Sequence, residues 1–347
     1  MRIAQVAPLY ERVPPKYYGG TERIVSCLTE ELVRQGHDVT LFASGDSITT
    51  AKLVSVCDEG LRLNPKYTDH ILYHMLSAEH AAQRADEFDF IHFHLTYLHY
   101  AIARRLTTAH VTTSHGRMDL PEYVPLYREY ADIPLISISD NQREPLPWLN
   151  WQGTVYHGIS EDLFQGRTEP GKYLAFLGRF SPEKRADRAI EIAKRSGIPL
   201  KIAAKIDKTD LEYFESTIKP LLDDPLIEYI GEIGEKEKQE FLSNAYAQVF
   251  PIDWPEPFGL VMIEAMACGT PTVAFRCGSV PEIIDDGVTG FIVESIEEAV
   301  NSLKRIPEIS RKKCRQVFEK RFSASRMVRD YLSIYGRIQS ESPARAA

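Results

Sequence analysis

The stretch WPEPFGLVMIEAMACGTP, residues 254–271, places two glutamates eight positions apart. Glu264 stands among valine, methionine, isoleucine and alanine, where a helix is expected to pack its core. A buried carboxylate without a partner is costly, so Glu264 must bond to something. The hydroxyls of a ribose would serve, and a core arginine or a loop capped by the carboxylate is the structural alternative. Glu256 stands between two prolines in a rigid loop and is expected to project beyond the phosphates of such a ligand.

A pair of cations, Arg179 and Lys184, directly follows the apolar run KYLAFLG. At the carboxyl end of a buried strand such cations face the cleft, where they can neutralise a diphosphate. Arginine would grip it with its planar fork and lysine would act as a point charge. The same residues also suit a solvated basic turn capped by Ser181, and the spacing alone leaves both interpretations open.

Paired glycines, Gly19 and Gly20, stand in PPKYYGGTERI between a strand and a helix. They let backbone amides approach a ligand closely, and the following helix presents unpaired N–H groups, which together would suit a phosphate. The alternative is a tight turn with Thr21 as the helix cap. The pattern is neither GxGxxG nor a Walker loop, which counts against a dehydrogenase or an NTPase.

Two more positions follow apolar runs and are candidates for a ligand site. The backbone of Glu232 and Ile233, after IEYIG, could line a flat pocket for a nucleobase, or it could start an amphipathic helix. His115 ends the run TTSH beside Gly116 and is expected to point at the cleft, in either a functional or a structural role.

The other histidine pairs favour structural roles over a metal site. His92 and His94 share one face of a strand, and His70 and His74 lie one helical turn apart. Neither pair has a third ligand or a cysteine partner nearby. No DxD sequence stands in a suitable loop, so the cations above are expected to replace a divalent metal. The sequence predicts neither a metal nor a cofactor.

Short apolar runs alternate with helical patterns through both halves of the chain. The runs are RIAQVA, DVTLFA, FDFIHFH, AHVTTSH and IPLISIS, then KYLAFLG, LKIAAK, IEYIG, AQVF, TPTVAF and GFIV. This alternation predicts two α/β domains, each a doubly wound, Rossmann-like parallel sheet with helices on both faces, which face a cleft. Ligands in such sheets bind beyond the carboxyl ends of the strands, so the loops described above are expected to carry the function.

The domain boundary is expected near residue 150, because LPWLNWQGTVYHGISEDLF shows less periodicity. Residues 1–150 would form the first domain and residues 151–322 the second. The last segment, residues 323–347, holds a helix that needs a surface to cover. Its apolar stripe is Met327, Tyr331, Ile334, Tyr335 and Ile338.

Composition and charge indicate an ordinary soluble globular chain. The 347 residues are 44% hydrophobic and carry a formal net charge of −8, which gives no reason to expect nucleic acid as a partner. No signal peptide is expected in MRIAQVAPLY, and no stretch approaches the roughly 20 apolar residues of a membrane span. Five dispersed cysteines favour reduced thiols in the cytoplasm. The ten Lys and Arg between positions 304 and 329 suit the solvated face of two helices, with a membrane-facing patch as the alternative.

With these residues assembled, the chain resembles the GT4-like family of retaining glycosyltransferases of GT-B fold. Four features of that family are matched: its E-x7-E pair, its R-x4-K pair, its paired glycines and its cleft histidine. They correspond to Glu256 and Glu264, Arg179 and Lys184, Gly19 and Gly20, and His115. The segment from EPFGLVMIEAMACGTPTVAF to GFIV is similar to that family throughout, and the resemblance covers about residues 1–335.

The resemblance implies a role for each matched residue. Glu264 would bind the ribose of a nucleotide sugar, Glu256 would bind donor-sugar hydroxyls, and His115 would lie near the sugar's hydroxymethyl group. Arg179 and Lys184 would stabilise the departing diphosphate. Backbone amides of the donor site would help, from Gly19, Gly20, Phe258, Gly259, Leu260 and Val261, with Ile233 lining the base pocket. The C-terminal helix would cross back onto the first domain.

The resemblance therefore implies a cytoplasmic, metal-independent, retaining hexosyltransferase. It would move a sugar from a nucleotide-diphosphate sugar to a hydroxyl acceptor by same-face attack, the acceptor being a small molecule, a glycan or a lipid-linked sugar. A nucleotide-sugar epimerase of the same fold and a nucleotide-sugar-binding protein without turnover are the alternatives. One segment departs from the family, since His157-Gly158-Ile159-Ser160 stands where Asn-Gly-(Val/Ile)-Asp is usual.

Overall fold

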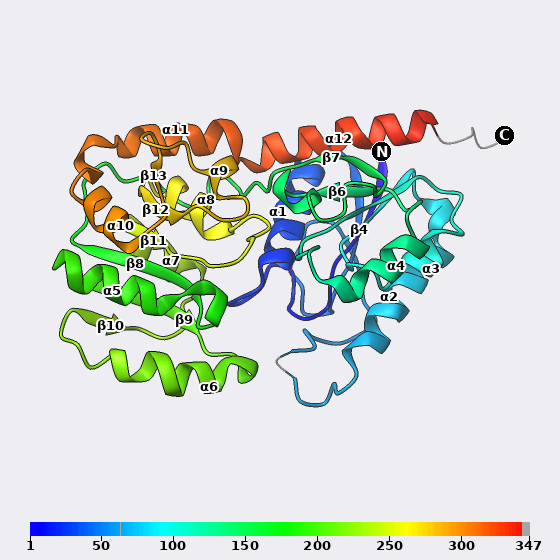
Figure 1. The fold of residues 1–347 in the computed structure, drawn as a ribbon. Helices are drawn as coiled ribbons and strands as arrows, with labels where there is room; N and C mark the ends of the chain where they lie inside the picture. Colours follow the sequence, from blue (N-terminus) through cyan, green and yellow to red (C-terminus); the bar gives the residue numbers. More distant parts are fainter. Residues whose placement is uncertain (63, 342–347) are drawn as a thin grey trace. The chain divides into compact units, whose positions relative to one another are not determined.

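A computed structural model of the protein describes residues 1–62 and 64–341 and divides them into two compact units. The first unit is Met1–Ser160 together with the C-terminal segment that begins at Ser323, and the second is Glu161–Phe322. Each unit is an α/β domain built on one parallel sheet (Figure 1). The sequence placed the division near residue 150, whereas the compact units divide after Ser160.

The first unit contains a seven-stranded parallel sheet in the order β3-β2-β1-β4-β5-β6-β7. Ile3 of β1 lies opposite Val39 of β2 and Phe90 of β4, and all three side chains are buried. The strands are β1 (Arg2–Val6), β2 (Asp38–Phe42), β3 (Lys52–Val54), β4 (Phe90–Phe93), β5 (His110–Thr113), β6 (Leu135–Ser137) and β7 (Trp151–Thr154). Five of these strands were predicted. The short edge strands β3 and β7 were missed, because neither is a buried apolar run.

Helices cover this sheet, and the first of them shows why they form. Helix α1 buries Ile24, Leu28 and Leu32, which recur at helical spacing. It is followed by Gly36, whose φ of 86° suits a glycine just beyond a helix end. The helices are α1 (Gly20–Arg34), α2 (His70–Gln83), α3 (Tyr100–Ala103), α4 (Val124–Glu129) and α12 (Ala324–Glu341).

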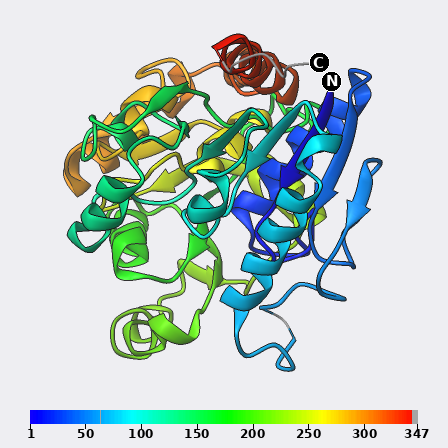
Figure 2. The same ribbon diagram turned by 90° about the vertical axis from the view of Figure 1, so that its right-hand side faces the viewer.

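The C-terminal helix α12 packs onto the first unit, as the family resemblance implied. All five residues of its apolar stripe are buried, and the helix contacts α1 and β5. The ring of Tyr335 stacks on Phe90 of β4 with 4.2 Å between the ring centroids. Figure 2 shows α12 close to end-on, near the N-terminus of the chain. The last helix therefore completes the core of a unit whose other elements come from the first 160 residues.

The second unit contains a six-stranded parallel sheet in the order β10-β9-β8-β11-β12-β13. All of its strands were predicted: β8 (Tyr173–Arg179), β9 (Leu200–Lys205), β10 (Ile227–Tyr229), β11 (Ala245–Phe250), β12 (Thr272–Phe275) and β13 (Gly290–Val293). Its helices are α5 (Ala186–Ser196), α6 (Leu211–Tyr213), α7 (Glu235–Ser243), α8 (Leu260–Ala267), α9 (Val280–Ile283), α10 (Ile296–Leu303) and α11 (Arg311–Arg321).

Four of the ten basic residues between positions 304 and 329 are engaged within the fold. Arg311 is buried and donates to three backbone carbonyls and a threonine hydroxyl. Arg315 donates to three carbonyls, Arg321 pairs with Asp285, and Arg326 is buried against the carbonyl of His157. The two that are buried, Arg311 and Arg326, are therefore not part of an exposed basic patch. Peripheral membrane contact stays a prediction.

Two further observations bear on the sequence predictions. Among the described helices, none combines the length and the apolar character that a bilayer span requires. None of the five cysteines, all of which lie in the described part of the chain, forms a disulfide, and three of them are buried.

Candidate functional site

The second sheet reverses its strand order between β8 and β11, which are hydrogen-bonded neighbours. A ligand of a doubly wound sheet binds at such a reversal, beyond the carboxyl ends of the strands. Arg179 is the last residue of β8, and Lys184 ends a short 3-10 turn just after it. Glu256 lies in the loop that follows β11. The topology therefore gathers three of the predicted site residues at one position.

Lys184 and Glu256 form an ion pair across this reversal. The indole N–H of Trp254 donates to the same carboxylate oxygen at 3.0 Å. The ammonium of Lys184 also lies over the Trp254 ring, 5.1 Å from its centroid. The carboxylate of Glu256 is thus fixed by a cation and an indole, a pairing that the sequence did not predict.

Arg179 also has carboxylate partners within the second unit. Its guanidinium lies 2.8 Å from Glu183 and 3.2 Å from Asp210, which comes from the loop after β9. Burial raises the pKa of Asp210, while the charge of Arg179 opposes that rise. An anion that binds Arg179 would share the guanidinium with these carboxylates or displace them.

Helix α8 begins at Leu260 and carries Glu264 on its buried side. Gly259 precedes the helix with a φ of 78°, and a Cβ there would lie 2.7 Å from Met262 and 3.1 Å from Phe250. Only glycine fits that position. The first N–H groups of the helix, including those of Leu260 and Val261, have no partner within the helix and can bind an anion.

Glu264 is 2% exposed and forms an ion pair with Lys238 of α7, 2.8 Å from Nζ to Oε1. The sequence interpretation that a ligand alone partners Glu264 is therefore wrong for one carboxylate oxygen. The alternative of a core arginine is wrong as well, because the partner is a lysine from another helix. The second oxygen, Oε2, is buried and has no hydrogen-bond partner in the described chain. Glu264 is half satisfied by the protein and can accept one more donor.

Two other predicted site residues, Phe258 and Ile233, have buried apolar side chains, so only their backbone groups can bind a ligand through hydrogen bonds. The Phe258 side chain is buried against Phe322, and its carbonyl accepts a hydrogen bond from Ser279 at 2.8 Å. Ile233 has a buried side chain and lies in the loop between β10 and α7. That helix starts at Glu235, so residues 232 and 233 are loop rather than helix start.

Gly278 packs directly against the backbone of Glu256, a contact that the sequence did not predict. Its φ is 56°, and a Cβ there would lie 2.3 Å from the backbone nitrogen of Glu256. The change Gly278→Ala is expected to destabilise the fold by at least about 2 kcal/mol, from left-handed strain plus the clash with the Glu256 backbone. Gly287→Ala is the matched control, since its φ is 73° and a Cβ would meet nothing within 4 Å. Thermal unfolding of both variants measures the two losses of stability, and equal losses would contradict the prediction.

The first sheet reverses its order between β1 and β4, and the paired glycines follow β1. Gly20 begins α1 and Gly19 caps it, without a side-chain cap. The alternative interpretation, with Thr21 as the helix cap, is wrong, because Thr21 lies inside the first turn. A Cβ at Gly19 would lie 2.7 Å from the Cβ of Pro15, so the chain packs too closely there for a side chain.

Glu22 in the first turn of α1 is a buried carboxylate that the sequence did not single out. Its Oε1 accepts the N–H of Glu11 at 3.3 Å. Burial raises its pKa from 4.5 to about 7. Between those values the folded state holds a proton that the unfolded state has lost, so stability falls as pH rises through this window.

The change Glu22→Gln is expected to remove this dependence. Relative to the variant, the wild type should lose about 3 kcal/mol of unfolding free energy between pH 4.5 and pH 7. Urea denaturation of both proteins at several pH values measures the difference. Glu79→Gln, at an exposed position of α2, is the control and should show no such term. A pH-independent difference between the wild type and Glu22→Gln would refute the assignment.

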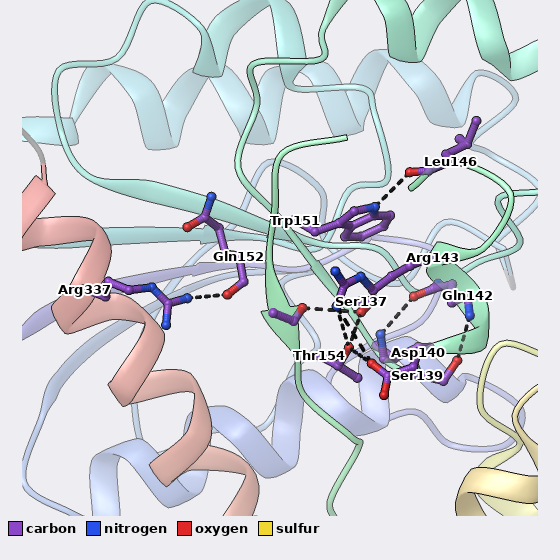
Figure 3. A network of polar contacts seen from close by, with 12 residues as sticks. Ser137, Ser139, Asp140, Gln142, Arg143, Leu146, Trp151, Gln152, Thr154 and Arg337 are labelled. Atoms are coloured by element: carbon purple, nitrogen blue, oxygen red, sulfur yellow. Dashed lines mark hydrogen bonds and ion pairs between the residues drawn. The ribbon is translucent and has the colours of Figure 1, made fainter. Parts of the chain in front are cut away.

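His115 follows β5 in a loop that Gln142 holds in place. The Gln142 amide donates to the carbonyls of Ser114 at 3.0 Å and Gly116 at 2.7 Å. Figure 3 shows Gln142 within a network that includes Ser139 and extends to Thr154 of β7. Gln142 thereby fixes the backbone on both sides of His115.

The His115 ring is enclosed by two other histidines. Its Nε2 lies 2.8 Å from Nδ1 of His94, and its face stacks on His157 with 5.2 Å between centroids. Burial lowers its pKa to about 3, so the ring is neutral at ordinary pH. The segment that departs from the family, residues 157–160, thus places a histidine against His115.

The two histidine pairs considered as metal ligands in the sequence have structural partners. His92 and His94 are buried and hydrogen-bonded, His70 Nε2 lies 3.2 Å from the carbonyl oxygen of Tyr67, and His74 accepts the N–H of Leu9 at 2.9 Å. Within the described ranges no cluster of three or more His, Cys, Asp or Glu is arranged to hold a metal. Gly19, Gly20 and His115 belong to the first unit, and the remaining predicted site residues belong to the second.

Two family models match the chain. Glycosyltransferase Family 4 matches residues 18–144, and Glycosyl transferases group 1 matches residues 160–321. A glycosyltransferase of Methanocaldococcus jannaschii is 25% identical over 84% of this chain and 85% of its own. The D-inositol 3-phosphate glycosyltransferase of Mycobacterium marinum is 33% identical over 40% of this chain, and the match spans only 33% of that protein.

Solved structures share the fold over nearly the whole chain. A glycosyltransferase involved in avilamycin A biosynthesis superposes with a TM-score of 0.75 at 21% identity, covering 98% of both chains. Anabaena HepE, in complex with UDP and glucose, gives a TM-score of 0.74 at 17% identity, covering 97% of this chain and all of that one. The two parallel-sheet domains therefore form a GT-B fold. Together with the two matched models, which lie one in each half of the chain, this places the protein in the GT4-type glycosyltransferases.

Proposed function

We propose that the protein transfers a sugar from a nucleotide-diphosphate sugar to a hydroxyl acceptor, with retention of the anomeric configuration. One observation carries the proposal. At the reversal between β8 and β11, Lys184 forms an ion pair with Glu256, and Arg179 stands nearby at the end of β8. Cations at that position suit a diphosphate. The UDP and glucose of the HepE structure agree with a donor of this class.

Each residue has a role in this proposal. Oε2 of Glu264, which has no donor among the described residues, accepts from a ribose hydroxyl, while Lys238 holds the other oxygen. Arg179 and Lys184 neutralise the diphosphate, and Glu256 orients the donor sugar. The backbone of the second unit from Phe258 to Val261 and that of the first unit at Gly19 and Gly20 offer amides to the phosphates, Ile233 lines the base pocket, and His115 faces the sugar.

The transfer step needs charge stabilisation more than a nucleophile. As the bond between the anomeric carbon and the phosphate oxygen breaks, negative charge grows on the diphosphate, where fixed cations and amides stabilise it. Glu256 is held by Lys184 and Trp254 through one carboxylate oxygen, and we assign it to sugar hydroxyls rather than to a covalent intermediate. The acceptor oxygen attacks from the face that the diphosphate leaves, and its proton passes to the departing phosphate oxygen.

A screen of UDP-, GDP- and ADP-sugars tests the proposal. One of them is expected to bind in calorimetry and to be hydrolysed slowly without an acceptor, with and without EDTA. The anomeric configuration of the transferred sugar, read by NMR, decides retention. Inversion would remove the same-face mechanism, and failure of every sugar nucleotide to bind would remove the donor class.

A further inference from the structure

A chain of hydrogen bonds runs through the first unit and ends at His115. It joins side chains that are distant in sequence and come from β1, from β4 and β5 or the residues just after them, and from α12. In order they are Tyr331, Thr113, His92, Tyr335, Gln5, His94 and His115. All of them are buried except His115, which is partly exposed. The chain therefore connects the core of the unit with the proposed sugar-binding histidine.

Gln5 is the fifth of the seven members, and its amide divides this chain of hydrogen bonds into two arms, one through His94 and one through Tyr335. Its Oε1 lies 2.8 Å from Nε2 of His94, and its Nε2 lies 3.4 Å from the Tyr335 hydroxyl. His94 Nδ1 lies 2.8 Å from Nε2 of His115. No other described side chain is hydrogen-bonded to these ring nitrogens of His94.

The orientation of the Gln5 amide sets the direction of the first arm. A carboxamide oxygen can only accept, so His94 must donate through Nε2. Burial, followed by the neighbouring histidines, lowers the pKa of His94 well below its usual value, so the ring is neutral and has one donor. Its Nδ1 then accepts, and Nε2–H of His115 donates to it. His115 carries its proton on Nε2 and has a lone pair on Nδ1.

The second arm agrees with the same orientation. The Gln5 N–H donates to the Tyr335 oxygen, which leaves the Tyr335 hydroxyl to donate to Nδ1 of His92 at 2.6 Å. His92 then donates through Nε2 to Thr113 at 2.7 Å. Each link has one donor and one acceptor. Turning the Gln5 amide over would reverse both arms and would move the His115 proton to Nδ1.

We propose that Gln5 and His94 are positioning residues that hold His115 as its Nε2–H tautomer, so that Nδ1 accepts a hydrogen bond from a hydroxyl of the transferred sugar. This rests on the proposed function. Nδ1 of His115 is buried and has no hydrogen-bond partner in the described chain. A buried acceptor without a donor is unfavourable, and a sugar hydroxyl supplies that donor.

Long-range proton–nitrogen NMR of the full chain, with labelled histidine, reads the tautomer directly. His115→Ala assigns the signal. The ring of His115 is expected to show a protonated Nε2 and an unprotonated Nδ1 in the ligand-free protein. A protonated Nδ1 would overturn the proposal, whether or not the protein turns over a sugar nucleotide.

Substitutions at His94 separate positioning from stability. His94→Leu removes the acceptor and is expected to mix the His115 tautomers and raise the donor KM about tenfold, as expected for one lost hydrogen bond. His94→Asn keeps an acceptor close to the Nδ1 position, so this variant should have nearly the wild-type tautomer at His115 and nearly the wild-type donor KM. His99→Leu is the matched control. His99 is another buried histidine, and its hydrogen bond, to Thr112 at 2.7 Å, does not belong to the series that ends at His115. Equal KM and tautomer changes in the two leucine variants would show a merely structural role.

Donor analogues test the direction of the proposed hydrogen bond between the sugar and Nδ1 of His115. Replacing the hydroxyl of the sugar's hydroxymethyl group by fluorine leaves an acceptor but no donor. This analogue should therefore bind about as weakly as the analogue in which that hydroxyl is replaced by hydrogen. Preferential binding of the fluorinated analogue would contradict an acceptor Nδ1. If no sugar nucleotide binds the wild type at all, the proposed function fails, while the tautomer measured in the free protein still decides the role of Gln5 and His94.

Discussion

Glycosyl transfer is expected to fall by at least about a thousandfold when Arg179 and Lys184 are both replaced by alanine. The estimate follows from the proposed mechanism, in which both groups stabilise the leaving diphosphate. One such group is worth roughly a hundredfold or more at comparable sites, and the loss of the second is expected to add at least about another tenfold. Lys184→Ala alone should have the larger single effect, because it also leaves Glu256 without its cation. Steady-state turnover with saturating donor measures these losses.

A matched pair of charges lies on the same unit. Lys194→Ala with Arg195→Ala removes one lysine and one arginine from the last turn of α5, at the opposite end of that helix from Lys184, where they form surface ion pairs with Asp224 and Glu191. Such pairs contribute little to stability, so this control should keep both fold and turnover. Unchanged turnover in Arg179→Ala/Lys184→Ala, with an intact fold by circular dichroism, would remove the diphosphate assignment.

The second large effect concerns Glu264. Glu264→Ala is expected to weaken donor binding by about tenfold to a hundredfold, the loss of one charge-assisted hydrogen bond, and to abolish measurable transfer. Calorimetric titration with the donor measures the affinity. Near-normal affinity would remove the ribose role.

Substitutions of Lys238 separate what the Lys238–Glu264 ion pair contributes to fold stability from what Glu264 contributes to donor binding. Lys238→Met leaves a buried carboxylate without its cation and is expected to cost about 3–5 kcal/mol of unfolding free energy. Adding Glu264→Gln should recover most of that stability, because the charge is removed, but not the donor affinity. Lys236→Met, at an exposed position of the same helix, is the control. Recovery of affinity in the double variant would mean that Glu264 acts only as a structural counterion.

Local patterns predicted the elements but not the contacts between them. Buried strands are continuous apolar runs, so β8 and β11 could be read from KYLAFLG and AQVF, and the loops after them followed from topology. Lys238 could not, because one lysine in GEKEKQEF differs from its neighbours only by which face of α7 it occupies. Gly278 was equally hidden, since its need for glycine comes from the Glu256 backbone more than twenty residues earlier.

Glu22 is another residue whose surroundings could not be predicted from the sequence. A glutamate in the first turn of a helix is ordinarily a favourable exposed charge. Its burial depends on the loop that contains Glu11, which no pattern in GGTERI specifies. The site residues could thus be located from sequence and resemblance, while their partners depend on tertiary packing.

The return of α12 to the first unit has a consequence for biosynthesis. During translation the second unit is one uninterrupted segment and can fold as soon as it leaves the ribosome. The first unit must wait for α12, with Phe90 uncovered and His92 without its tyrosine partner until then. Nascent chains should therefore acquire protease resistance in the later-made half first, an order opposite to the direction of synthesis.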